Sequence, residues 1–121
     1  MDAHAAYRRE LGGLGEELAA VFLERSGIRV VDRNWRSPAG EIDIVARDGP
    51  VLVVAEVKTR TRLGHGHPIE AIGRRKRQRL RGLGRAWARA RRVRCHPLRI
   101  DGLGVLITDG RVFISHERGM A

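Results

Sequence analysis

The middle of the sequence holds an aspartate, Asp43, and the short run Glu56-Val57-Lys58. On a strand, side chains two residues apart share a face, so Glu56 and Lys58 are expected to project together. Carboxylates gathered on one face repel each other, and a divalent cation relieves that repulsion. A lysine beside such a metal can orient or deprotonate a water and neutralise charge in the transition state. These residue types fit hydrolysis of a phosphodiester bond.

A hairpin must bring these side chains together. Residues 41–47 and 51–58 are rich in strand-forming side chains, and Asp48-Gly49 between them predicts a tight turn. With a two-residue turn there, Asp43 pairs across from Val54. A loop one residue longer or shorter would break the arrangement. The predicted register places four charged side chains on one face of the sheet: Glu41, Asp43, Glu56 and Lys58.

A plainer interpretation of these charges is the solvated face of an edge hairpin with ordinary Glu–Lys pairs. The neighbouring segments 42–45 and 51–55 are apolar enough to indicate a buried central hairpin instead. Charges at the end of a buried strand are costly and therefore need a function. The apolar context favours the site.

The remaining elements follow from hydrophobic periodicity. The first helix is expected to bury one apolar face, made of Leu11, Leu14, Leu18, Val21 and Phe22. Helices are predicted over 7–25 and from near Pro68 to about Arg92, and strands over 28–35, 41–47, 51–58, 99–107 and 111–116. The order α-β-β-β-α-β-β predicts an α/β fold, a mixed sheet flanked by helices, in one domain over 1–121.

The formal net charge of +10 favours a polyanionic partner, although basic surfaces also occur on proteins that bind no nucleic acid. Of 24 basic residues, only Lys58 and Lys76 are lysines, which singles them out for chemistry. Lys76 falls within the apolar stripe of the second helix. It either extends outward along its stem or reaches the hairpin's carboxylates, and we favour the second. The other faces of that helix carry arginines expected to follow a phosphate backbone without reading bases: Arg74, Arg75, Arg77, Arg81, Arg85, Arg89, Arg91 and Arg92.

Composition also restricts where the protein works. The longest apolar run, residues 51–55, is far shorter than the roughly 20 residues that span a membrane, and no signal-peptide core precedes it. A single cysteine, Cys95, excludes an internal disulfide and a cysteine-cluster zinc site. His65 and His67 lie in a glycine-rich loop without further ligands at zinc spacing. We expect a cytoplasmic protein.

Four segments carry a resemblance to a known family: residues 15–19 (GEELA), 33–36 (RNWR), 40–46 (GEIDIVA) and 56–60 (EVKTR). Together they closely resemble the YraN-like family of bacterial proteins, and Pro68, 70–72, 76–80 and 99–101 match its pattern too. That family is similar to archaeal Holliday-junction resolvases and to restriction endonucleases. The resemblance implies the PD-(D/E)xK nuclease fold, with a site formed by Glu16, Asp43, Glu56 and Lys58.

The helical period supports Glu16, because it places this residue beside Ala19, Ala20 and Leu23 rather than on the exposed face. The implied enzyme is an endonuclease for structured or single-stranded DNA. Asp43, Glu56 and Glu16 would hold Mg²⁺ or Mn²⁺, Lys58 would assist the nucleophile, and Lys76 and Arg60 would join the helix arginines in binding DNA. The alternatives are a catalytically silent nucleic-acid-binding module of the same fold and an interaction subunit whose basic face meets an acidic protein. A homodimer and an activating protein partner are also expected possibilities, and exposure of Val112, Phe113 and Ile114 would favour the dimer.

Overall fold

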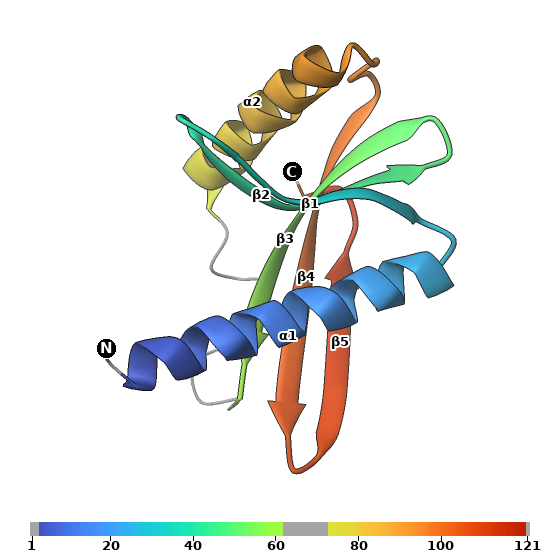
Figure 1. The fold of residues 1–121 in the computed structure, drawn as a ribbon. Coiled ribbons are helices and arrows are strands. Elements are labelled where there is room, and N and C mark those ends of the chain that lie inside the picture. The colour runs from blue at the N-terminus through green and yellow to red at the C-terminus, as the bar shows by residue number, and fades with distance from the viewer. Residues whose placement is uncertain (1–2, 62–72, 121) are drawn as a thin grey trace.

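The structure, a computed structural model, describes residues 3–61 and 73–120 (Figure 1). They form a five-stranded sheet in the order β1-β2-β3-β4-β5, in which β3 and β4 are parallel and every other neighbouring pair is antiparallel. The elements are α1 (Ala3–Arg25), β1 (Arg29–Ser37), β2 (Gly40–Asp48), β3 (Val51–Arg60), α2 (Arg74–Arg91), β4 (Leu98–Thr108) and β5 (Arg111–Glu117). The predicted mixed α/β fold and its element order are confirmed.

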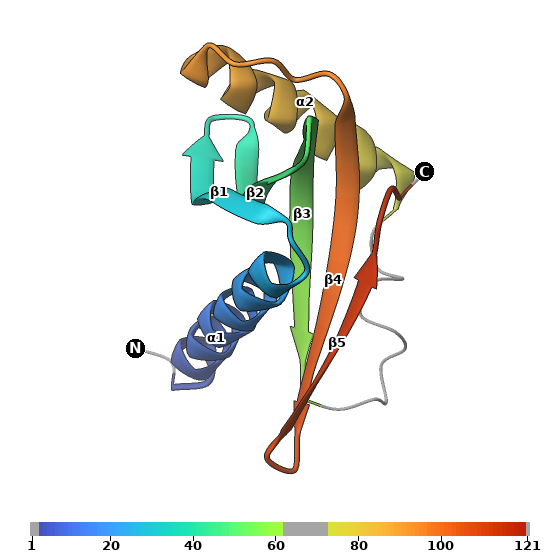
Figure 2. The same ribbon diagram turned by 90° about the vertical axis from the view of Figure 1, so that its right-hand side faces the viewer.

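The two helices pack on opposite faces of the sheet, so the sheet has a core on each side (Figure 2). Alternation along β3 sends Val53 and Ala55 to the core beneath α1, and Leu52 and Val54 to the core beneath α2. A strand covered on both faces is apolar at every position, which is why residues 51–55 form a continuous apolar run.

Strand β2 turns away from β3 at Asp43. Ile42 lies in the α2-side core and Ile44 in the α1-side core, although residues two apart on a regular strand share a face. Pairing between β2 and β3 reaches only Ile44 opposite Ala55. Among the described residues, the last part of β3, from Glu56 to Arg60, therefore pairs with β4 alone. This opens one edge of β3 at the point where the charged residues follow.

The register of the β2–β3 hairpin corrects the predicted one. Asp48 pairs with Val51, so the turn consists of Gly49 and Pro50 rather than Asp48 and Gly49. Gly49 has a φ of 59°, a conformation that favours glycine, and Pro50 has no N–H to donate to a ladder. Asp43 thus falls in line with Glu56 and not with Val54. Because the slip is two residues, Asp43 still shares a face with Glu56 and Lys58, whereas the bend at Asp43 moves Ile42 to the face opposite the one that alternation predicts.

Helix α1 is rotated from the predicted orientation, so that of the predicted apolar face Leu18 and Phe22 pack partly against the core. Leu14 and Val21 are 48% and 44% exposed, whereas the fully covered positions are Gly15, Ala19, Ala20 and Leu23. A Cβ placed on Gly15 would lie 1.9 Å from Oγ1 of Thr59, so the helix can approach β3 only with glycine there. Close packing of small residues decided the orientation, and this signal is weaker in a sequence than leucine spacing.

Helix α2 begins at Arg74, later than predicted. Gly73 precedes it in an extended conformation, with φ −82° and ψ 174°, and so cannot belong to the helix. The predicted start at Pro68 and the histidines at 65 and 67 lie outside the described residues. Leu80, Leu83 and Trp87 are buried as expected.

A buried aspartate on β4, Asp101, links the C-terminal segment to the sheet through hydrogen bonds. It accepts hydrogen bonds from Nε of Arg99 at 2.8 Å and the backbone N–H of Gly119 at 3.0 Å, and its Oδ2 lies 2.8 Å from Nε2 of His116. Burial raises the pKa of Asp101, but these hydrogen bonds outweigh burial and hold the pKa at about 2. The stability it contributes is therefore present above pH 3.8 and is lost as the pH falls toward 2.

Candidate active site

Five charged side chains from four elements meet beside the open edge of β3. Glu56 and Lys58 come from β3 itself, Asp43 from the bend in β2, Glu16 from α1 and Lys76 from α2. Helix α1 lies on one face of the sheet and α2 on the other (Figure 2), and Glu16 of α1 interacts with Asp43 while Lys76 of α2 pairs with Glu56. The structure thus brings together all four predicted catalytic residues, and Lys76 with them.

Glu56 lies at the centre of this group and is buried. Its Oε1 is 2.5 Å from Nζ of Lys76 and 3.6 Å from Nζ of Lys58. Burial tends to lower the pKa of Lys76, but the hydrogen bond to Glu56 outweighs it and raises the pKa. Burial also lowers the pKa of Lys58, and the neighbouring Lys76 charge lowers it further. Of the two lysines, Lys58 therefore releases its proton more readily.

Asp43 is held directly beside Glu56. Its Oδ2 accepts a hydrogen bond of 2.8 Å from the backbone N–H of Val57, on the open edge of β3. Burial, followed by the charge of Glu56, raises the pKa of Asp43 to about 7. A raised pKa of this kind means that burial, and after it the nearby carboxylates, make the charged form of Asp43 costly.

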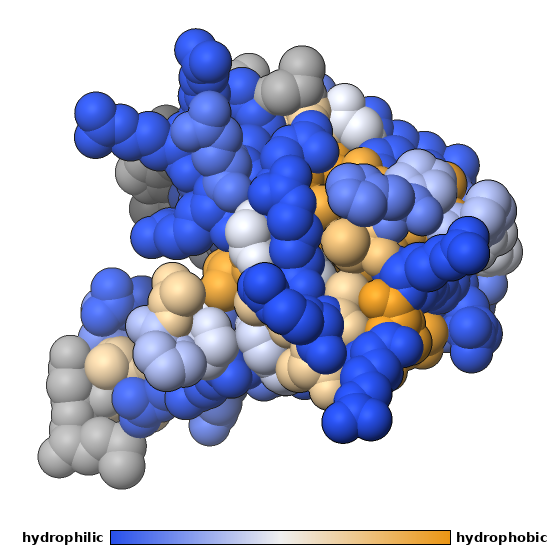
Figure 3. Space-filling view, turned by 90° about the horizontal axis from the view of Figure 1, so that it is seen from above, coloured by the Kyte–Doolittle hydropathy of each residue, from blue (hydrophilic) through white to orange (hydrophobic). Residues whose placement is uncertain are grey.

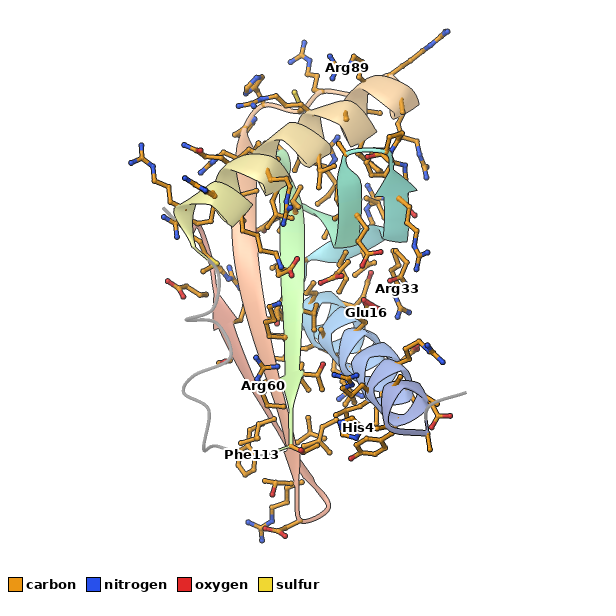
Figure 4. All side chains as sticks on the ribbon, turned by 90° about the vertical axis from the view of Figure 1, so that its left-hand side faces the viewer. His4, Glu16, Arg33, Arg60, Arg89 and Phe113 are labelled. Carbon is orange, nitrogen blue, oxygen red and sulfur yellow. The ribbon has the colours of Figure 1, made fainter. Side chains whose placement is uncertain are left out.

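Glu16 completes the acidic group from α1. Figure 4 shows it on the side of the helix that faces the β1–β2 hairpin, with Arg33 beside it. With the side-chain amide of Asn34 assigned so that its nitrogen rather than its oxygen faces Glu16, the nitrogen donates to both carboxylate oxygens at 2.9 and 3.1 Å. Burial raises the pKa of Glu16, and hydrogen bonding with Asp43 opposes that rise. Asn34 was not among the predicted site residues. Its φ of 52° is a conformation that asparagine tolerates better than most residues do. The signal in the sequence was therefore the asparagine itself.

Two hollows flank the charged group. The α2-side hollow has a volume of about 260 Å³ and is lined by Gly40, Glu41, Asp43, Glu56, Lys76, Arg79 and Leu80. The α1-side hollow, of about 250 Å³, is lined by Arg8, Leu11, Gly12, Glu16, Val57, Lys58, Thr59 and Arg60. The candidate site is therefore reached from both faces of the sheet. Arg8 and Arg79 were missed because nothing in a sequence with this many arginines distinguishes them.

The donor set fits a divalent cation of the hard, oxygen-binding kind. Within residues 3–61 and 73–120, no three acidic, histidine or cysteine side chains are grouped as a ready three-ligand site. Mg²⁺ needs less, because it commonly takes one or two carboxylates and completes its shell with water and phosphate oxygens. Asp43 and Glu56 can supply that pair, with Glu16 close enough to hold a water. Burial and the charge of Glu56 raise the pKa of Asp43, and a cation bound here would stabilise the charged carboxylate and lower that pKa again.

The predicted nucleic-acid contacts are divided between the site and the outer surface. Lys76 and Arg60 line the two hollows, whereas Arg74 and Arg75 are exposed on the first turn of α2. Arg77 and Arg81 are half-buried on the same helix. Figure 3, which looks onto the end of the molecule where α2 lies, shows hydrophilic side chains around a smaller hydrophobic area. The exposed Arg74 and Arg75 directly precede Lys76, so basic side chains adjoin the candidate site.

The model of the Uncharacterised protein family UPF0102 matches residues 15–105. The chain belongs to this family. A UPF0102 protein of Renibacterium salmoninarum is 55% identical over 112 residues, which cover 92% of this chain and 95% of that protein. UPF0102 proteins of Streptomyces griseus and of a Nocardioides species are 48% identical over 117 residues and 46% over 119, with at least 94% of each chain covered.

The UPF0102 match extends over every residue of the charged group, from Glu16 to Lys76. The predicted YraN-like resemblance is thereby confirmed at the level of the family. None of the helices in the described part of this UPF0102 protein is long and apolar enough to cross a membrane.

Proposed function

We propose that this UPF0102 protein binds nucleic acid in the cytoplasm and hydrolyses its phosphodiester bonds with the help of Mg²⁺ or Mn²⁺. The observation that carries the proposal is the meeting of Glu16, Asp43 and Glu56 with two lysines, in which the pKa of Asp43 rises to about 7. The resemblance to restriction endonucleases and resolvases points the same way. DNA, structured or single-stranded, is the proposed substrate.

Each residue has a role that its position allows. Asp43 and Glu56 would hold the cation, which polarises a phosphodiester and lowers the pKa of a bound water. Glu16, steadied by Asn34, would orient the attacking water. Lys58, whose pKa burial lowers, would donate to the scissile phosphate or take a proton from that water. Lys76, which pairs with Glu56 here, would donate to a phosphate oxygen of a bound strand.

A silent nucleic-acid-binding module of the same fold is the second candidate. The contact between Nζ of Lys76 and Glu56 at 2.5 Å favours it, because an ammonium group there already neutralises the central carboxylate. In that case, the carboxylates and lysines would form an internal ion-pair network, and the arginines of α2 would provide the affinity. An interaction subunit for an acidic protein is distinguished from both by competition, since any DNA displaces a protein that binds phosphates.

The deciding experiment is a nuclease assay of the whole chain with Mn²⁺, Mg²⁺ or EDTA on single-stranded, duplex, flapped and four-way-junction DNA. Cleavage is expected with either metal, none in EDTA, and none in the double variant Asp43→Asn/Glu56→Gln. The matched control, Glu10→Gln/Glu24→Gln, removes the same charge from exposed positions of α1 and should cleave normally. Binding without cleavage under every condition would favour the silent module or a missing activating partner.

We also propose a homodimer through the outer edge of β5. Val112 and Phe113 are 45% and 52% exposed, and within the described residues β5 pairs only with β4. Two antiparallel copies centred on Ile114 would place Arg111 of each opposite Glu117 of the other. Sedimentation equilibrium should give twice the chain mass. Arg111→Glu should yield monomers, and adding Glu117→Arg should restore the dimer; a monomeric parent chain would contradict the proposal.

A further inference from the structure

The α1-side hollow is a second recess beside the charged group. Its walls are the N-terminal half of α1, with Arg8, Leu11 and Gly12, and the open edge of β3 as far as Arg60. Figure 4 shows Arg60 toward the C-terminal end of β3, beyond the level at which Glu16 of α1 lies. The hollow borders Glu16 and Lys58, so a chain-like ligand that reaches the carboxylates can continue into it.

The two hollows carry opposite charge. The α2-side hollow has three carboxylates, Glu41, Asp43 and Glu56, against the two cations Lys76 and Arg79. The α1-side hollow has three cations, Arg8, Lys58 and Arg60, against the single carboxylate of Glu16. The first therefore suits a cation and the second an anion, side by side along one path.

The open edge of β3 adds a backbone donor to the α1-side hollow. The N–H of Val57 points away from β4, because it donates to Asp43 on β2. Backbone groups two residues apart on a strand point the same way, so the N–H of Thr59 points out of the same edge. Together with two arginine side chains, such an N–H is suited to a phosphate oxygen.

Gly12 forms part of the wall for no packing reason that the described residues reveal. A Cβ added there would have nothing within 4 Å, whereas the same atom on Gly15 would collide with Thr59. Glycine inside a helix costs about 1 kcal/mol relative to alanine. A glycine wall lets a ligand approach the helix backbone closely, which is what a side chain at position 12 would prevent.

We infer that the α1-side hollow binds a phosphate group of the nucleic-acid strand, next to the phosphate at Asp43 and Glu56. Arg8, Arg60 and the N–H of Thr59 are its ligands, and Gly12 gives the room. The strand then runs from α1 across the open edge of β3 and on toward α2. This inference rests on the proposed nucleic-acid binding, and it adds Arg8 and Gly12 to the residues that contact the substrate.

The first test measures the affinity of the full chain for a fluorescein-labelled single-stranded oligonucleotide in EDTA, by anisotropy, so that cleavage plays no part. Arg8→Ser should weaken binding by about fivefold or more and lower the salt slope by about one. The control Arg25→Ser removes the same charge about 25 Å away along α1 and should change affinity less than twofold. Equal effects of the two variants would overturn the inference.

The second test asks whether position 12 contacts the strand, using two variants that leave the net charge unchanged and stabilise α1 alike. Gly12→Ala and Gly13→Ala both add a methyl group that meets nothing within 4 Å, and both should raise the melting temperature. Only Gly12→Ala should weaken oligonucleotide binding, by about threefold or more. Equal binding by the two alanine variants would overturn the inference while leaving nucleic-acid binding intact. Binding of inorganic phosphate but of no oligonucleotide would overturn both proposals.

Discussion

Lys58→Ala should slow metal-dependent strand cleavage by about 10²–10⁴-fold while leaving DNA affinity within about threefold. The side chain lies 3.6 Å from Glu56, and burial together with the Lys76 charge lowers its pKa. It is therefore placed to move a proton or to neutralise charge that develops in the transition state, and neither role requires strong ground-state binding. Single-turnover cleavage and anisotropy titrations on the same DNA give the two numbers.

Lys58→Arg separates the two roles of this lysine. Arginine keeps the charge but does not release its proton, so a proton-transfer role predicts a loss close to that of alanine. A purely electrostatic role predicts substantial rescue. Arg75→Ala, at an exposed position of α2, is the control and should affect binding more than rate. If Lys58→Ala loses affinity as much as rate, Lys58 is a phosphate contact and the catalytic assignment is wrong.

The site was more predictable than the packing around it. Glu56 and Lys58 share a face because strand alternation leaves no alternative, and Asp43 keeps that face even though the hairpin turn is at Gly49 and Pro50. The period of α1 correctly turned Glu16 inward. These predictions depend only on the alternation of side chains along a strand and on the helical period. They therefore hold even when a turn is displaced by two residues or the start of a helix is wrong.

What the sequence could not supply was the bend in β2 and the contact of α1 with Thr59. The bend puts Ile42 and Ile44 on opposite sides of the sheet, and only tertiary packing requires it. Gly15 decides how closely α1 packs against β3, and hydrophobic periodicity does not reveal this residue because it has no side chain. The sequence left open whether Lys76 extends outward or reaches the carboxylates of the hairpin, because the distance between α2 and β3 was not known.

Asp43→Asn should stabilise the metal-free protein at high pH. The pKa of Asp43 is about 7 in the folded chain and 3.8 in the unfolded one. Between these values the folded state binds more protons, so the free energy of unfolding falls as pH rises from about 4 to about 7 and stays low above that. Removing the ionisable group removes this loss. The gain at pH 8 should be about 2 kcal/mol, with none at pH 4, because the carboxyl is then largely protonated in the folded state.

Thermal unfolding in EDTA at both pH values measures this difference, and about 8 °C is expected at pH 8. Asp109→Asn is the matched control: the same change at an exposed turn should shift the melting temperature equally at both pH values. A lower melting temperature for Asp43→Asn at pH 8 would mean that the hydrogen bond from Val57 outweighs the repulsion among the carboxylates.

Metal addition should reverse the order of the two proteins. A cation that binds only the folded state stabilises it by about 2.7 kcal/mol at a hundredfold excess over its dissociation constant. At pH 8, Mn²⁺ should therefore raise the melting temperature of the parent protein by several degrees and that of Asp43→Asn hardly at all. At pH 5 the parent should respond less, because protons compete for Asp43. Equal stabilisation of both proteins would place the cation elsewhere. No stabilisation of either would mean that Lys76 alone neutralises Glu56, and the silent module would then be the better account of this site.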